Sequence, residues 1–328
     1  MKHQTRYFVL GASGLLLVGL FTGLFAYVNR GAALAVSVSG PAELAFVPAD
    51  ASIVAYANVQ EVMRSDFRER VRQITPDGVG QAQDELEQQL GLNIEQDIDH
   101  VVAFLAPGPD EGRPAGLVLF RGRFDTTKLE AAARSRGAVV STYGGTRVVS
   151  VETGEAGALA MASLEPGLLA VGDLATVHQA VDRGAAADNI ETNEAMMALL
   201  ERVDSGSNAW AVGRFGDLSS LGIVPDEVST QMPAISGFAI DGRVNGGLSG
   251  TVSIEGGDEA AGQNLRDVLR GFLALAQMQT TGRPELQVML ESLQLSGTGT
   301  MATMSFSIPS AALDVLFAAV TSETASTP

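Results

Sequence analysis

Residues Tyr7 to Val28 form an unbroken apolar segment without a charged side chain, and this segment constrains the chain more than any other. A bilayer core requires roughly 20 apolar residues in helical form. Helix is required because lipid offers the backbone no hydrogen-bond partners. Lys2 and Arg6 precede the segment and Arg30 follows it, a bias that predicts a cytoplasmic N-terminus and an exported remainder. We therefore expect a single-pass inner-membrane protein whose bulk is periplasmic or otherwise extracytoplasmic.

Large apolar and aromatic side chains of this segment are expected to contact membrane lipid. They are Tyr7, Phe8, Leu15, Leu16, Leu17, Leu20, Phe21, Leu24, Phe25 and Tyr27. Gly19 and Gly23 form a G-x-x-x-G spacing that lets helices approach closely. A cleaved signal peptide is the alternative, because Ala33-Leu34-Ala35 offers a small-x-small cleavage site. Its apolar region is usually shorter than this one, which favours a retained anchor.

Composition excludes several classes of function. The formal charge is −17, which disfavours binding to nucleic acid or to anionic lipid. The chain has no cysteine, so disulfides, thiolate metal sites and cysteine nucleophiles are absent. The hydrophobic content of 46% suits a well-cored globular chain.

Beyond the anchor, alternating apolar and polar residues predict antiparallel strands with one wet face. Gly144-Gly145 and Asn245-Gly246 mark two hairpin turns. Glu259 to Gln279 predicts a long helix whose packed stripe is Leu265, Val268, Leu269, Phe272 and Ala276. The fold class predicted is α+β, with the N-terminal transmembrane helix followed by two related antiparallel sheets, each backed by helices on one face. The expected divisions are 1–30 for the stub and helix, 31–47 for a stalk, 48–204 and 205–320 for two α+β repeats, and 321–328 for a disordered tail.

Four stretches of the first half correspond in order to stretches of the second. Residues 52–62 align with 207–218, 101–106 with 236–241, 116–133 with 250–269 and 159–181 with 295–320. The expected hairpin at 138–151 has no counterpart. This pattern predicts a diverged internal duplication.

Several of these motifs resemble a known family. The motifs are Val47-Pro-Ala-Asp-Ala-Ser before a strand, Tyr143-Gly-Gly-Thr in a hairpin, the stretch Gly167 to Val181, and Asn193-Glu-Ala-Met-Met before Ala209-Trp-Ala-Val. They resemble the uncharacterised bacterial envelope proteins that carry an N-terminal membrane helix and a duplicated extracytoplasmic domain of unknown function. The resemblance covers most of residues 47–218. It implies a fold and a location, and it supplies no catalytic residues.

The chemistry-bearing residues are few. Asp97, Asp99 and His100 are the only candidates for a divalent-cation site, and a solvated turn capped by Asp97 is the favoured interpretation. No G-x-S-x-G or P-loop motif follows a strand, so we expect no catalytic residues, no cofactor and no enzyme activity.

The predicted function is therefore that of a non-enzymatic, membrane-tethered accessory or scaffolding subunit. It would bind lipid through its N-terminal helix and a membrane or envelope protein complex through its outer part, without nucleic acid. A periplasmic carrier of a small apolar or lipid ligand is the alternative. A hydrolase that uses His100 with Asp97 or Asp99 is a third hypothesis.

Overall fold

A computed structural model describes most of the chain beyond residue 40. The described residues are 41–65, 93–108, 114–135, 137–152, 158–183, 188–215, 235–244, 246–279, 287, 290–311 and 313. The helices are η1 (Ala42–Phe46), α2 (Val59–Arg64), α5 (Ile94–Asp97), α6 (Thr126–Ser135), α7 (Leu174–Arg183), η3 (Ile190–Thr192), α8 (Glu194–Leu200) and α11 (Glu259–Gln279). The strands of the first half are β1 (Ile53–Ala57), β2 (Ile98–Pro107), β3 (Pro114–Gly122), β4 (Val139–Tyr143), β5 (Thr146–Glu152), β6 (Ala158–Glu165) and β7 (Leu168–Asp173). Those of the second half are β8 (Ala209–Arg214), β9 (Ile235–Val244), β10 (Gly247–Gly256), β11 (Gln294–Ser296) and β12 (Met301–Pro309).

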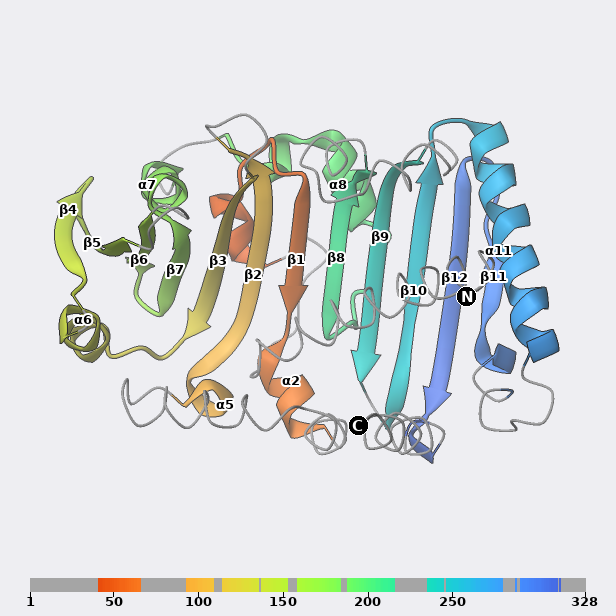
Figure 1. Cartoon of the computed structure of the whole chain (residues 1–328), viewed down its shortest axis with the longest axis horizontal. Coiled ribbons are helices and arrows are strands. Elements are labelled where there is room, and N and C mark those ends of the chain that lie inside the picture. Colours follow the sequence, from red (N-terminus) through yellow and green to blue (C-terminus); the bar gives the residue numbers. More distant parts are fainter. Residues whose placement is uncertain are drawn as a thin grey trace, which may run out of the picture.

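The twelve strands of the described residues belong to one antiparallel sheet, which Figure 1 shows from one edge to the other. Their order is β11-β12-β10-β9-β8-β1-β2-β3-β7-β6-β5-β4. The prediction of two separate sheets behind a transmembrane helix is therefore wrong. The two halves join because β1 pairs with β8, so neither strand is left as an edge with unpaired backbone groups.

The strand order repeats outward from this central pair. It runs β1-β2-β3-β7-β6 on one side and β8-β9-β10-β12-β11 on the other. Tyr56 of β1 lies opposite Trp210 of β8. The alanines on either side are register partners too, Ala55 with Ala211 and Ala57 with Ala209. The two aromatic rings stack with centroids 5.6 Å apart and planes 18° apart. The halves are thus related by a local twofold axis that passes beside this aromatic pair.

Helices cover the face of the sheet that carries Tyr56 and Trp210. Side chains of η1, α7, η3 and α8 pack there against β1, β2, β3, β6, β7 and β8 in one apolar core. The buried members that come from helices are Leu44, Phe46, Val177, Ala180, Ile190, Met196 and Leu199. The long helix α11 packs on β10, β11 and β12 at the end of the sheet opposite β4.

The opposite face carries an apolar residue at the same level on every strand. The row formed by successive register partners is Val140, Val149, Met161, Val171, Val118, Ala103, Ala55, Ala211, Ile240, Val252, Met304 and Leu295. Ala55 and Val149 are buried, and the other ten are half-buried. The continuity of this row agrees with one sheet that shares a single apolar surface across both halves.

Both hairpin turns predicted from glycine occur. Gly144 and Gly145 join β4 to β5 with φ of 53° and 81°, and Gly246, with φ of 67°, lies between β9 and β10. These positive values suit glycine, which lacks the Cβ that makes them costly elsewhere.

No helix among the described residues is long and apolar enough to cross a membrane. On this finding the predicted placement as a single-pass inner-membrane protein is contradicted. The segment that motivated it, Tyr7 to Val28 with Gly19 and Gly23, lies outside the described residues.

Candidate functional site

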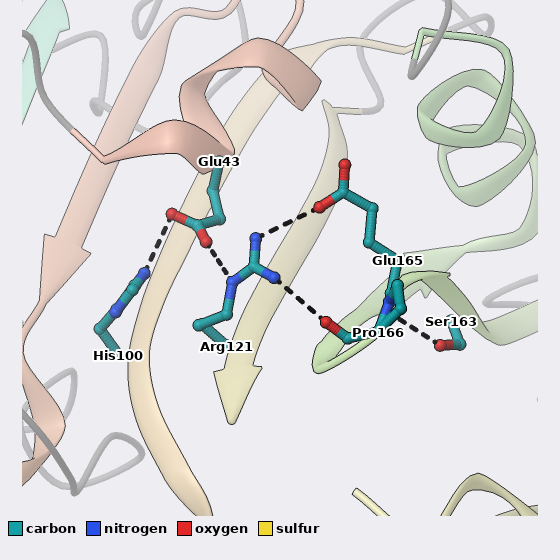
Figure 2. Close-up of polar contacts among 6 residues, drawn as sticks. All are labelled: Glu43, His100, Arg121, Ser163, Glu165 and Pro166. Atoms are coloured by element: carbon teal, nitrogen blue, oxygen red, sulfur yellow. Dashed lines mark hydrogen bonds and ion pairs between the residues drawn. The ribbon is translucent and has the colours of Figure 1, made fainter. Parts of the chain in front are cut away.

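The most buried acidic side chain of the described residues lies at the centre of a polar cluster in the first half. Glu43 belongs to η1 and is only 2% exposed. Its Oε2 lies 2.9 Å from His100 Nε2, and its Oε1 accepts a hydrogen bond of 2.6 Å from Arg121 Nε (Figure 2). A buried carboxylate is tolerated where charged or polar donors replace the lost water, and both oxygens of Glu43 have such a donor.

The strands fix the two donors side by side. His100 on β2 is the register partner of Arg121 on β3. Arg121 extends further to the turn between β6 and β7, where it donates to Pro166 O at 3.4 Å and pairs with Glu165 at 3.5 Å. Figure 2 shows Arg121 between Glu43 and this turn. The cluster therefore fastens η1 and the β6–β7 turn to the middle of the sheet.

Burial raises the pKa of Glu43, but its hydrogen bond with His100, the positive charge of His100 and the bond from Arg121 outweigh that effect and lower the pKa to about 2. Glu43 is consequently ionised throughout the physiological pH range. A carboxylate held in this state is a poor general acid or base near neutral pH.

The three residues proposed from sequence as a cation site are not brought together. His100 contacts Glu43, whereas Asp97 Oδ2 accepts a hydrogen bond of 2.8 Å from Asn93 N at the start of α5. Asp99 lies at the register shift between β2 and β3. The described part of the chain contains no group of three or more His, Cys, Asp or Glu side chains that could hold a metal ion. Neither a metal site nor a hydrolase built on His100 with Asp97 or Asp99 gains support from this geometry.

Two further buried titratable side chains, Tyr56 and Asp241, lie on the same face of the sheet as the cluster. The ring of Tyr56 lies 5.6 Å from that of His100, and burial raises the pKa of the Tyr56 hydroxyl. Asp241 is the register partner of Trp210 and is 6% exposed. Its Oδ1 accepts a 2.9 Å bond from Ser207, while burial raises the pKa of its carboxyl. These contacts all join residues of this chain.

A polar hollow of about 520 Å³ lies between α2 and the β9–β10 turn. Its lining is Glu61, Arg64, Ser65, Gly206, Asn208, Arg243, Val244 and Gly246. Asn208 lines the hollow. Its side-chain amide donates a hydrogen bond to Glu61, and its Oδ1 accepts one from Val244 N at 2.5 Å. Arg243 donates to Gly206 O at 2.5 Å and to Asp204 at 3.2 Å. A lining of this kind does not suit a small apolar or lipid ligand.

Four of the large apolar side chains that are exposed among the described residues lie on α11. Val268 is 46% exposed, Phe272 56%, Leu275 52% and Met278 74%. The sequence predicted Val268 and Phe272 on the packed stripe, and that assignment is wrong. The helix packs instead through Ala261 and Leu265, while Arg266 donates to the backbone oxygens of Gly299 and Met301.

Sequence reasoning also missed Glu43, because its partners are 57 and 78 residues away in the chain. One local signal could have been weighed, namely a lone acid inside the apolar run Ala42 to Val47. The membrane-anchor residues predicted from the sequence lie outside the described part of the chain.

Comparisons with known proteins add little. No family model and no curated protein matches the chain. Among solved structures, crystal form I of TP0453 has a TM-score of 0.47 at 10% identity, covering 86% of this chain and 98% of that one. Crystal form III has a TM-score of 0.46 at 10% identity, with 85% and 97% covered. Similarity at this level does not indicate a function.

Proposed function

We propose that this protein is a non-enzymatic accessory or scaffolding protein that acts through a protein–protein contact made by the outer face of α11. The observation that carries the proposal is the set of four exposed apolar side chains Val268, Phe272, Leu275 and Met278, hereafter the α11 stripe. Their spacing of four, three and three residues aligns them along one side of the helix.

The α11 stripe is costly to leave in water. Burial of apolar surface contributes about 25 cal/mol per Å², and aromatic and methionine side chains are enriched at protein interfaces. Recognition of a helix through apolar side chains at such intervals is a recurrent mode of protein binding. Contiguous exposed apolar surface of this kind supports an interaction site better than isolated exposed residues do.

The polar cluster supports the non-enzymatic part of the proposal. Glu43 and Arg121 are occupied by partners within the chain, and the pKa of Glu43 lies far below neutral. The resemblance to duplicated envelope proteins stays a prediction. The carrier alternative gains no support from the polar lining of the hollow beside α2.

The test places a photoreactive amino acid at Ala274, which is exposed on α11 beside the stripe, in the full chain expressed in its native host. Irradiation is expected to give a discrete protein crosslink that disappears when Phe272→Ser and Leu275→Ser are combined. The matched control combines Val139→Ser and Leu159→Ser, two exposed apolar positions at the other end of the sheet with 65% and 47% exposure. A crosslink that survives the α11 changes, or that the control removes equally, would overturn the proposal.

A further inference from the structure

The rotation of α11 about its own axis is not the one that would bury most of its apolar side chains. Successive residues of an α-helix are turned by about 100° around its axis. Between residues 259 and 278 the buried positions are Ala261, Gly262, Leu265 and Arg266. The half-buried positions are Leu269, Leu273 and Ala276. Together they form a packed side whose centre lies about 60° from the centre of the large apolar residues, which include the α11 stripe.

Arg266 is a charged residue that this rotation buries, with 7% of its surface exposed. Its Nη1 donates to Gly299 O at 2.9 Å and to Met301 O at 2.5 Å, and its Nη2 donates to Gln263 Oε1 at 2.9 Å. A buried guanidinium is tolerated only where acceptors replace the lost water. The side chain therefore ties one side of α11 to two carbonyl oxygens at the β11–β12 turn.

The turn between β11 and β12 allows a close approach by the same side of the helix. Gly297 and Gly299 have φ of 114° and 57°, values that favour glycine over other residues. A Cβ on Gly262 would lie only 2.4 Å from Gly299 O, so the helix backbone reaches the turn directly at this position. Gly262 lies about one helical turn before Arg266. The glycine contact and the arginine bonds thus select the same rotation of α11.

Burial of apolar side chains favours a different rotation. A roll of about 60° would turn Val268 and Phe272, which are 46% and 56% exposed, toward the sheet. The same roll would turn Leu273 and Arg266 outward. Apolar burial would stabilise the rolled position, whereas the bonds of Arg266 to the turn would be broken in it. The polar bonds at the turn and the apolar surface of the helix therefore compete for its rotation.

We infer that Arg266 is a positioning residue that holds α11 in the rotation that displays the α11 stripe, an inference that rests on the proposed function and adds its regulation. In the displayed rotation Arg266 is bonded to Gly299 and Met301. In the withdrawn rotation Phe272 lies against the sheet and Arg266 lies in water. A partner that binds the stripe favours the displayed rotation, because only that rotation offers the stripe. A change that opens the bonds of Arg266 withdraws the contact surface.

Two single-cysteine variants report the rotation, because the chain has no cysteine of its own. Leu275 is exposed and Leu273 is half-buried, so a neutral maleimide should label Leu275→Cys faster than Leu273→Cys. Adding Arg266→Glu removes both donors to the turn, and we expect labelling to fall about fivefold at residue 275 and to rise about fivefold at residue 273. Arg266→Lys retains donors and should keep the original order.

The matched control is Arg270→Glu, which makes the same change of charge at an arginine whose side chain is 59% exposed and pairs with Asp267. It should leave both labelling rates within about twofold, because exposed ion pairs contribute little. A rise at both cysteines in Arg266→Glu would show a loosened helix and not a roll, and would overturn the inference. So would two unchanged rates.

The photocrosslink from residue 274 separates this inference from the proposed function, because Ala274 lies opposite the packed side and stays exposed in both rotations. The crosslink should disappear in Arg266→Glu and persist in Arg270→Glu. If the labelling order reverses while the crosslink persists, the contact through the stripe is overturned and the role of Arg266 stands. If the rates do not change while the crosslink still depends on Phe272, the role of Arg266 is overturned and the proposed function stands.

Discussion

Beyond β6 the sheet of the first half continues into a two-stranded hairpin, whereas beyond β12 the described part of the second half adds only the three-residue β11, and α11 there exposes several apolar side chains. The equivalent helices differ accordingly. α6 has ten residues and contacts the hairpin, while α11 has twenty-one. The strand order outward from β1 and from β8 is the same in both halves, as the predicted duplication would give, and the described parts of the halves differ at their outer ends. The α11 end is where the proposed partner contact would lie.

The polar cluster also belongs to one half alone. Relative to the central Tyr56–Trp210 pair, Ala239 and Ser253 occupy the register positions of His100 and Arg121. Ser253 is 7% exposed and lies 3.3 Å from Thr303, with hydroxyl oxygens facing each other. The same place in the two halves is thus held by an ion network in one and by a single neutral hydrogen bond in the other. Stability should respond very differently to changes at these two places.

Glu43→Gln is expected to cause the largest loss. It removes the charge that holds His100 and Arg121, and breaking a buried pair costs about 3 kcal/mol of unfolding free energy. Ser253→Ala at the corresponding place should cost about 1 kcal/mol. Urea unfolding followed by the fluorescence of Trp210, the only tryptophan, measures both. Equal costs would show that the two halves are not distinguished by their polar contacts.

Acid should destabilise the protein through the same carboxylate. The pKa of Glu43 falls from its ordinary value of 4.5 to about 2 on folding, so the stabilisation is present above pH 4.5 and is lost as the pH drops through 2. The folded state holds this proton less readily than the unfolded state, which makes unfolding easier in acid. The loss amounts to about 3 kcal/mol. Unfolding curves between pH 6 and pH 2 should show it in the wild type but not in Glu43→Gln.

Local features of this fold could be predicted from the sequence, whereas contacts between distant residues could not. The glycine turns at residues 144–145 and 246 are set by neighbouring residues and were predictable. The pairing of β1 with β8 depends on residues far apart, although one signal was present. The run Ile53 to Ala57 is apolar at every position, which suits a central strand covered on both faces and not an edge. The helix α11 misled prediction because its apolar side is wider than the part that packs.

Two glycines of α11 provide the next test, since one faces the sheet end and the other faces outward. A Cβ at Gly262 would lie 2.4 Å from Gly299 O, a backbone atom that cannot easily move. Gly262→Ala should therefore destabilise by about 2 kcal/mol. Gly271→Ala meets open space and should stabilise the protein by roughly 0.5–1 kcal/mol. Thermal unfolding compares the two variants, and a loss in Gly271→Ala would mean that the outer side of Gly271 is already covered.

The smallest effect is expected where the extra hairpin meets α6. Arg147 on β5 pairs with Glu130 of α6, which also pairs with Arg134 at 2.7 Å. The side chain of Arg147 is 62% exposed, and exposed ion pairs contribute between zero and about 1 kcal/mol. Arg147→Gln should therefore lower the unfolding free energy by less than about 0.5 kcal/mol, and added salt should abolish the difference. The hairpin is held mainly by its backbone pairing with β6 and by Tyr143, which stacks on His178 at 3.8 Å and donates to Asp182. A loss above 1 kcal/mol in Arg147→Gln would instead make the ion pair the element that secures this end of the sheet. The contrast with the α11 end would then rest on charge and not on strand pairing.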